Sequence, residues 1–236
     1  MTRVETVAYG PHPSQVVDFH LPARGAAPDV RVTLLHGGFW REAYDRAHLV
    51  PLATELAERG LEVALAEYRR VGGGGGWPET FDDVVRAAGT RRDAPAARRH
   101  VLVGHSAGGH LALWAASSPA AGAVAVDHVV ALAPVADLAR ARELGLSRGA
   151  VGELVAPDRE HAADPMRLPP PRVPVTLVHG TRDEDVPVDL SRAYARAARA
   201  AGAAVELTVL EGAGHYEPIT PGTPGCAAWA ASLTTA

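Results

Sequence analysis

Ser106 has the clearest chemical context of any residue in this sequence. It is the centre of the pentapeptide GHSAG at 104–108, which directly follows the apolar run His100–Val103 and opens the helical pattern Ala107–Ser117. A strand, a sharp turn and a helix in this order lift a serine hydroxyl above the edge of a sheet, with a helix N-terminus behind it. The turn is tight, so the positions beside the serine must lack bulky side chains. The pattern predicts a nucleophilic serine.

A serine hydroxyl becomes a good nucleophile only when a base accepts its proton. On elbows of this kind the acid and then the base follow the serine along the chain. The histidines after Ser106 are His110, His128, His161, His179 and His215. Only His215 follows the last expected strand, in a glycine-containing loop at 211–215 that can bring the imidazole over Ser106. We therefore predict His215 as the base.

The acid that orients this imidazole is expected after the penultimate strand. The loop at that point contains three carboxylates, Asp183, Glu184 and Asp185. Asp183 stands at the turn that leaves the strand. Asp185 stands beside the start of the next helix, where a carboxylate interacts favourably with the helix N-terminus. We predict Asp183 as the acid, with Asp185 as the first alternative and Glu184 as the second.

A second glycine-rich turn follows the apolar run Val30–Leu35, in the sequence HGGFW at 36–40. Glycines there let the backbone approach a bound acyl group closely. The backbone N–H groups of Gly38 and Phe39, together with that of Ala107, are predicted to form an oxyanion hole. We interpret His36 as a structural residue that holds this loop by hydrogen bonds.

Strand-like and helix-like runs alternate through most of the chain. The expected strands are Arg3–Ala8, Gln15–His20, Val30–Leu35, Leu61–Ala66, His100–Val103, Asp127–Ala133, Pro174–His179 and Val205–Leu210; the expected helices are Ala47–Arg59, about 78–92, Ala107–Ser117, Pro187–Ala201 and Gly222–Leu233. This alternation is typical of an α/β fold with a mostly parallel, doubly wound sheet flanked by helices. The stretch 137–171 breaks the rhythm and is predicted to be a short cap insertion within one domain, 1–236. Such sheets bind ligands at the carboxyl ends of their strands.

Aromatic and basic side chains near these loops are candidates for substrate contact. The predicted pocket residues are Trp40, Tyr68, Trp77 and Tyr216, which would favour a flat or aromatic substrate. The alternative for Trp40 and Trp77 is that they pack the loops against the sheet. Arg69 and Arg70 have planar guanidinium groups that either bind a substrate carboxylate or form structural ion pairs.

Composition excludes several other classes of protein. The chain has 236 residues, 47% hydrophobic and 21% charged, with a net charge of −4, and no basic run suggests a nucleic-acid partner. Cys226 is the only cysteine, which excludes an intrachain disulfide and a thiolate zinc site, and no cluster has metal-ligand spacing. Neither a signal peptide nor a membrane-spanning run is visible. We expect a cytoplasmic protein that needs no metal or cofactor; the sequence does not indicate its oligomeric state.

Four motifs in order resemble the α/β-hydrolase superfamily: HGGFW at 36–40, GHSAGG at 104–109, HGTRDEDVP at 179–187 and GAGH at 212–215. HGGFW, with EYR at 67–69 and Trp77-Pro78, is similar to the kynurenine formamidase (arylformamidase) and small carboxylesterase branch. In related sequences the aspartate four residues after the histidine of HGxxD is the triad acid, which corresponds to Asp183. Hormone-sensitive-lipase-like esterases have a third glycine where this chain has Phe39, a departure from that pattern.

The resemblance implies a serine hydrolase with the triad Ser106, Asp183 and His215, acting through an acyl-enzyme. Its expected substrate is a small carboxylic ester or an aryl formamide such as N-formylkynurenine. One alternative is a small peptidase of the prolyl-oligopeptidase type. The other is a binding module that kept the fold without catalysis, although such modules usually lose a triad member.

Overall fold

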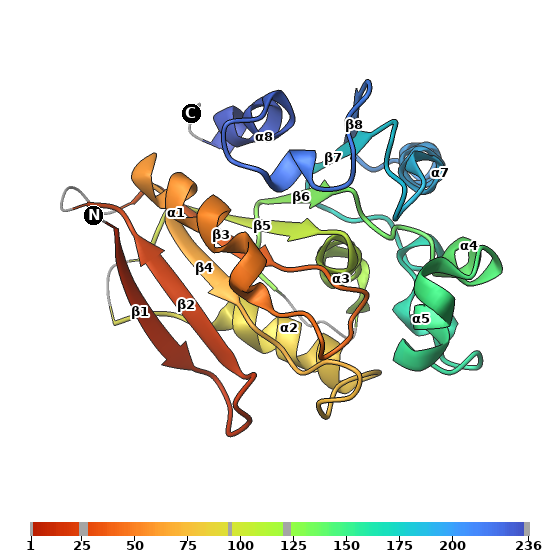
Figure 1. Ribbon diagram of the computed structural model, residues 1–236, viewed down its shortest axis with the longest axis horizontal. Helices are drawn as coiled ribbons and strands as arrows, with labels where there is room; N and C mark the ends of the chain where they lie inside the picture. Colours follow the sequence, from red (N-terminus) through yellow and green to blue (C-terminus); the bar gives the residue numbers. More distant parts are fainter. Residues whose placement is uncertain (1, 24–27, 94–95, 120–123, 234–236) are drawn as a thin grey trace.

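A single eight-stranded sheet forms the centre of the molecule (Figure 1). The computed structural model describes residues 2–23, 28–93, 96–119 and 124–233. The strands are β1 Arg3–Ala8, β2 Val16–Leu21, β3 Val30–Leu35, β4 Glu62–Ala66, β5 Arg99–His105, β6 His128–Leu132, β7 Val175–Gly180 and β8 Val205–Leu210. They lie in the order β1-β2-β4-β3-β5-β6-β7-β8. The pairs β1–β2 and β2–β4 are antiparallel, and all the others are parallel. The predicted fold class, an α/β-hydrolase sheet with helices on its two faces, is confirmed.

Helices cover both faces of the sheet, which is why the central strands are apolar throughout. On one face, α1 (Val50–Glu58) and α8 (Pro224–Ala230) pack on alternate strand residues such as Val101 and Val103. On the other face, α2 (Glu79–Gly89), α3 (Ala107–Ser117) and α7 (Val188–Ala200) pack on the residues between them, such as Leu102. Strand side chains point alternately to opposite faces, so both faces contribute to the hydrophobic core.

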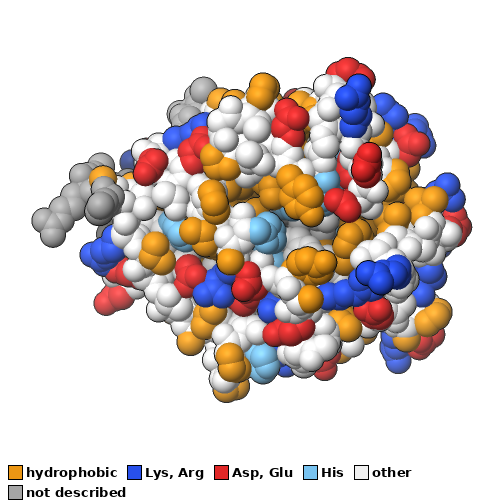
Figure 2. Space-filling view, viewed as in Figure 1, with side chains coloured by type: hydrophobic (Ala, Val, Ile, Leu, Met, Phe, Trp, Pro, Cys, Tyr) orange, Lys and Arg blue, Asp and Glu red, His pale blue; other side chains and the backbone are white. Residues whose placement is uncertain are grey.

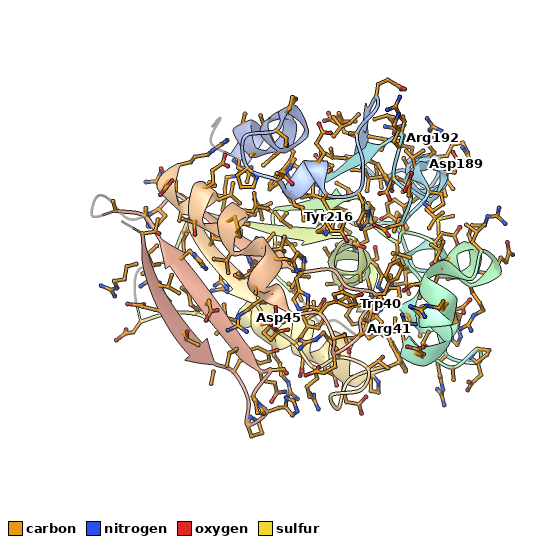
Figure 3. The ribbon with its side chains drawn as sticks, viewed as in Figure 1. Trp40, Arg41, Asp45, Asp189, Arg192 and Tyr216 are labelled. Carbon is orange, nitrogen blue, oxygen red and sulfur yellow. The ribbon has the colours of Figure 1, made fainter. Side chains whose placement is uncertain are left out.

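The expected cap insertion consists of short helices beside α3 and α7. These are α4 (Leu138–Glu143), α5 (Leu146–Leu154), α6 (Glu160–Ala163) and the 3₁₀ turn Pro165–Arg167. Three consecutive residues of α5, Ser147 to Gly149, have left-handed backbone angles, so its first turn is not regular helix. Arg41, labelled in Figure 3, comes from the loop after β3. It holds this turn through hydrogen bonds to the carbonyl and hydroxyl of Ser147 and to the Glu153 carboxylate. The insertion is thereby tied to the loop that follows β3.

Three helices differ from the prediction by more than one residue. The last, expected over Gly222–Leu233, consists of α8 and the 3₁₀ turn Ala231–Leu233. The expected helix Ala47–Arg59 is divided into a 3₁₀ turn, Arg46–Leu49, and α1. Pro51, the second residue of α1, lacks the N–H that would donate to the Ala47 carbonyl, so the 3₁₀ turn and α1 do not form one continuous α-helix. The helix expected to reach about residue 92 ends at Gly89, because the next residue is extended.

The helices of the described ranges are short. None combines the length and the apolar character that a transmembrane segment needs. The predicted cytoplasmic location stays a prediction.

Candidate active site

Ser106 lies at the junction of β5 and α3, with backbone angles that few non-glycine residues adopt. Its φ of 56° and ψ of −118° are fixed by hydrogen bonds from its N–H to Leu132 (2.8 Å) and from His110 N–H to its carbonyl (3.1 Å). Backbone strain of this kind costs about 1–3 kcal/mol and persists only where the surroundings enforce it. A Cβ added at Gly108 would lie 2.3 Å from the Leu35 carbonyl oxygen, so the elbow needs glycine there.

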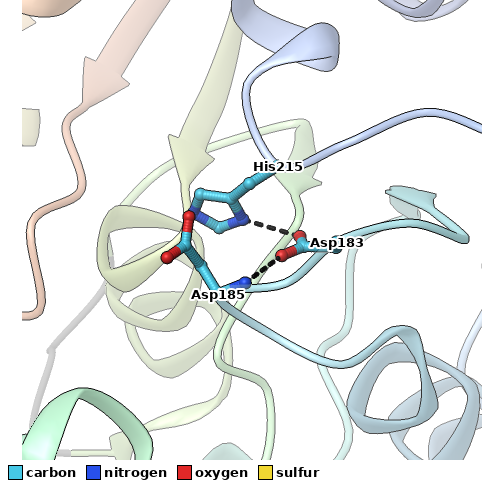
Figure 4. Close-up of side chains that lie close together, drawn as sticks. All are labelled: Asp183, Asp185 and His215. Carbon is cyan, nitrogen blue, oxygen red and sulfur yellow. Dashed lines mark hydrogen bonds and ion pairs between the residues drawn. The ribbon is translucent and has the colours of Figure 1, made fainter.

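His215 and Asp183 meet across the loops that follow β8 and β7 (Figure 4). The Nδ1 of His215 lies 2.6 Å from Oδ2 of Asp183, while Oδ1 of Asp183 accepts the N–H groups of Asp185 (3.0 Å) and Val186 (2.7 Å). An ionised carboxylate can only accept, so Nδ1 donates and Nε2 keeps its lone pair. A His215 in this tautomer can accept a proton at Nε2.

The Asp183 carboxylate is stabilised in its charged form. Burial alone would raise its pKa, but hydrogen bonds from His179 and His215 hold the pKa well below its usual range. The Nε2 of His179 lies 3.1 Å from Oδ2 of Asp183 and 2.8 Å from the Val186 carbonyl, and its Nδ1 lies 2.7 Å from the Ser191 hydroxyl. His179 was set aside as a base in the sequence, and its support of Asp183 was missed. The four-residue spacing of the two side chains was the available signal.

His105 supports the base from beneath and was also missed. Its Nε2 donates to the carbonyl of His215 at 3.0 Å, and the two ring centroids are 4.6 Å apart. Burial, and then the electrostatic effect of the nearby His215, keeps the pKa of His105 well below its usual value. A neutral His105 adds no positive charge beside His215. Its place inside the serine motif was the only sequence signal.

The predicted oxyanion loop has three successive residues with positive φ: Gly38 (103°), Phe39 (48°) and Trp40 (58°). The Gly38 carbonyl accepts the N–H of Arg41 at 3.1 Å, which closes the turn. Within the described ranges, the N–H groups of Phe39 and Ala107 donate to no acceptor. For Ala107 this follows from its position in the first turn of α3, where N–H groups have no partner inside the helix. Both groups are available to a ligand.

Glu67 anchors this loop from inside the protein. Its carboxylate accepts hydrogen bonds from Nε2 of His36 (2.8 Å) and from the N–H groups of Arg46 and Tyr68 (3.1 Å each), and it pairs with Arg70. Burial alone would raise the pKa of Glu67, but the hydrogen bond from His36 and the other donors lower it to about 2. Tyr68 donates its hydroxyl to the His36 carbonyl at 2.6 Å and stacks on its ring. His36 therefore has the structural role that the sequence indicated.

Ser106, His215 and the predicted oxyanion loop line one cavity of about 260 Å³ at the carboxyl ends of the central strands. It is lined by Gly38, Phe39, Tyr44, His48, His105, Ser106, Ser147, Asp185, His215 and Tyr216. Figure 2 shows hydrophobic side chains gathered around the hollow, with histidines between them. Tyr44 and Tyr216 are exposed at its rim. Among the predicted site residues, the cavity brings together Ser106, His215, Gly38, Phe39 and Tyr216.

The prediction of three further aromatic contacts is wrong. Trp40 and Tyr68 are completely buried, and Trp40 packs against His110 with ring centroids 5.1 Å apart. Trp77 does not line the cavity and packs edge-on against Phe81 at 4.7 Å. Large rings at the ends of strands and helices fill the space between layers, so loop position in the sequence did not imply contact with a ligand.

Arg69 and Arg70 are held in ion pairs inside the protein. The Nε of Arg69 lies 2.8 Å from the Asp83 carboxylate, and a second nitrogen makes a matching bond of 2.8 Å. Arg70 pairs with Glu67 and, at 3.1 Å, with Glu42. Both guanidinium groups are therefore structural and take no part in the cavity.

Besides His105, four cavity residues were not among the predicted site residues. Tyr44 and His48 come from the segment before α1, Ser147 from the cap and Asp185 from the acid loop. Tyr44, His48 and Ser147 belong to no motif whose spacing indicates pocket lining, and Asp185 was predicted only as the alternative acid. One ligand atom from each of Asp183, Asp185 and His215 lies within 4.8 Å of the others, a spacing that a metal ion could use. The hydrogen bonds that Asp183 makes to the other two residues account for this closeness.

Family comparison agrees with this geometry. The family model BD-FAE matches residues 17–197, which include the serine elbow and the Asp183 loop. The chain belongs to the BD-FAE family. The isoprenylcysteine alpha-carbonyl methylesterase ICME of Arabidopsis thaliana is 26% identical to this BD-FAE chain over 245 residues, 90% of this chain and 56% of that protein. The chain spans 50–58% of the length of the three plant methylesterases it matches.

Solved structures share the fold of this BD-FAE chain. Esterase B from Lactobacillus rhamnosis superposes with a TM-score of 0.82 at 20% identity, covering 98% of this chain and 84% of that one. The butyrate-bound esterase Est2 of Thermogutta terrifontis gives a TM-score of 0.75 at 23% identity, covering 98% and 90%. At these identities the likeness shows the fold alone. The kynurenine formamidase part of the resemblance stays a prediction.

Proposed function

We propose that this chain is a serine esterase that cleaves small acyl esters without a cofactor. His215 accepts the proton of Ser106 as its oxygen attacks the carbonyl carbon of the ester. The N–H groups of Phe39 and Ala107, with that of Gly38, stabilise the oxyanion. His215 then gives its proton to the leaving alcohol, and an acyl-enzyme remains. Water, deprotonated by His215, releases the carboxylic acid and restores Ser106.

The observation that supports this proposal most is the 2.6 Å hydrogen bond between His215 and Asp183 at a cavity that also contains Ser106. Asp183 fixes the tautomer in which Nε2 can accept a proton, and it stabilises the imidazolium that follows. An ionised Asp183 keeps this role over the pH range in which esterases are assayed.

The size and lining of the cavity favour a short acyl group. A volume of about 260 Å³ lies below the range of about 300–1,000 Å³ typical of pockets for drug-sized ligands. Phe39 and Tyr216 offer apolar surface beside the serine. The named relatives and structural neighbours are esterases, one of them described with bound butyrate. An aryl formamide such as N-formylkynurenine is the competing substrate class.

Two serines line the cavity, and they provide a matched control. A fluorophosphonate probe should label the wild type and a Ser147→Ala variant, but not Ser106→Ala. Labelling that persists in Ser106→Ala would refute the assigned nucleophile. A folded wild type that is never labelled would favour a non-catalytic binding module.

Substrate class is tested by kcat/KM for p-nitrophenyl acetate, p-nitrophenyl butyrate and N-formylkynurenine, with Ser106→Ala as the blank. The proposal expects both esters to exceed the formamide. If kcat/KM for the formamide exceeds the values for both esters, the substrate class is aryl formamides and the proposal of a small ester is wrong. Cleavage confined to short proline-containing peptides would favour the peptidase alternative.

A further inference from the structure

A second cavity lies at the amino ends of the parallel strands, whereas Ser106 lies at their carboxyl ends. It has a volume of about 60 Å³ and is lined by Arg31, Glu62, Arg91, Arg92, Ala96, Ala97, Arg99 and His100. Arg31, Glu62 and Arg99 lie at the amino ends of β3, β4 and β5. Ser106 follows the carboxyl end of β5. At about 3.3 Å per strand residue, Arg99 and Ser106 are roughly 20 Å apart. The second cavity is therefore separate from the proposed active site.

Positive charge dominates this cavity. Four guanidinium groups line it, against the single carboxylate of Glu62. Glu62 accepts hydrogen bonds from two nitrogens of Arg92 at 3.2 and 2.9 Å, and Arg92 also pairs with Glu5 at 3.2 Å. In the parts of the chain that the structure describes, no carboxylate lies within ion-pair distance of Arg31, Arg91 or Arg99. Three cations thus share the cavity without a counter-charge of their own.

Arg31 is the most constrained of these cations. Its residue surface is only 3% exposed, and its guanidinium carbon lies 5.4 Å from the centre of the Phe19 ring, which covers it. One nitrogen donates to the Ala88 carbonyl at 3.4 Å, while Nε and Nη1 have no partner among the described residues. Buried donors in native proteins are nearly always satisfied by protein, water or an ion. The two unpaired nitrogens of Arg31 therefore need an acceptor that the described residues do not supply.

The titration of neighbouring groups is consistent with a positive local potential. Burial, followed by repulsion from Arg91, lowers the pKa of Arg31 to about 10 in spite of the attraction of Glu62. Burial and then the charge of Arg31 lower the pKa of His100 to about 4. His100 is thus neutral near pH 7 and adds no further charge. An anion in the cavity would lower the cost of keeping Arg31 charged.

We propose that this cavity is a binding site for one small tetrahedral oxyanion, inorganic phosphate or sulfate. Guanidinium groups match the oxygen spacing of such anions and bind them through paired N–H donors. The charge of the anion would offset that of Arg31, Arg91 and Arg99. A volume of about 60 Å³ has room for about two water molecules or one such anion. Because the site is built from three strands, the anion binds the folded chain and not the unfolded one.

The test is the melting temperature in phosphate and in chloride at equal ionic strength. A ligand of the folded state at about ten times its dissociation constant should raise the melting temperature by about 3–6 °C. We expect this rise in the wild type, and a matching rise in sulfate. It should be lost in Arg31→Met and reduced in Arg91→Met, a second variant in which an exposed side chain is changed. The KM for p-nitrophenyl butyrate should not change with phosphate.

The control is Arg98→Met, which removes the same charge from a side chain that is 87% exposed and does not line the cavity. It should keep the full rise. Equal rises in all the variants would indicate a general salt effect and overturn the proposal, as would no rise in the wild type. Competitive inhibition of esterase activity without a change in melting temperature would place the anion in the Ser106 cavity, and this too would overturn it.

Discussion

Replacing Glu67 by Gln tests whether one buried charge holds the oxyanion loop. The Glu67 side chain is 4% exposed and accepts hydrogen bonds from His36, from two backbone N–H groups and from the buried Arg70. Gln keeps the shape but removes the charge, and its NH₂ group faces donors where an acceptor is needed. We expect a less stable protein and a loop that no longer presents its N–H groups to the oxyanion.

The size of the effect follows from the lowered pKa of Glu67. A change from 4.5 to about 2 corresponds to about 3 kcal/mol in favour of the charged, folded state, at about 1.4 kcal/mol per unit. Removing one partner of a buried ion pair typically costs about 3–5 kcal/mol, a range that includes this value. Because the folded pKa is depressed, this stability is fully present above about pH 4.5 and is lost as the pH falls through about 2.

Urea denaturation at two pH values measures both the size and the sign. The free energy of unfolding of Glu67→Gln should lie about 3 kcal/mol below that of the wild type at pH 7, but only about 1 kcal/mol below it at pH 3. Glu143→Gln, at a side chain that is 66% exposed, should differ by less than about 0.5 kcal/mol. A difference that stays the same at pH 3 would refute the electrostatic reasoning. So would a Gln variant as stable as the wild type at pH 7.

Three further substitutions test the site itself. Asp183→Asn should lower kcat for p-nitrophenyl butyrate by about 10⁴-fold, because the wrong imidazole tautomer is favoured, whereas Asp185→Asn should change it by less than about tenfold; the reverse order would make Asp185 the acid. Gly108→Ala should abolish soluble, active protein, since its Cβ would lie 2.3 Å from a carbonyl oxygen. The control is Gly89→Ala, whose Cβ would have no atom within 4 Å; it should leave the free energy of unfolding unchanged or raise it by up to about 1 kcal/mol. Arg41→Met removes four hydrogen bonds that tie α5 to the loop after β3 and should raise KM severalfold with a smaller change in kcat; an unchanged KM would show that the cap does not shape the cavity.

The alternation of apolar runs was sufficient to predict the order and type of the strands. Every expected strand is present within two residues of its predicted ends, because strands buried on both faces appear in sequence as continuous apolar runs. Predicted helix ends were less accurate. Pro51 divided one helix, and the left-handed turn at Ser147–Gly149 in the cap includes Ser147, which accepts hydrogen bonds from Arg41 in a distant loop.

The sequence by itself determined the groups whose chemistry depends on local backbone geometry. The strained turn at Ser106 and the glycines of the HGG loop are local requirements, and their motifs are therefore contiguous. The order of Asp183 and His215 along the chain also follows from the strand sequence. The hydrogen bond between Nδ1 of His215 and Asp183 fits the prediction that Asp183, and not Asp185, is the acid.

Only the tertiary structure decided what surrounds those groups. Whether Trp40 faces a ligand or the core depends on which helix packs against it, and here His110 of α3 does. The supports of the site, such as Glu67 beneath His36, join residues about thirty positions apart, and the Arg31 cavity joins three strands. Such contacts leave no short pattern in a sequence, because each depends on how separate elements pack together.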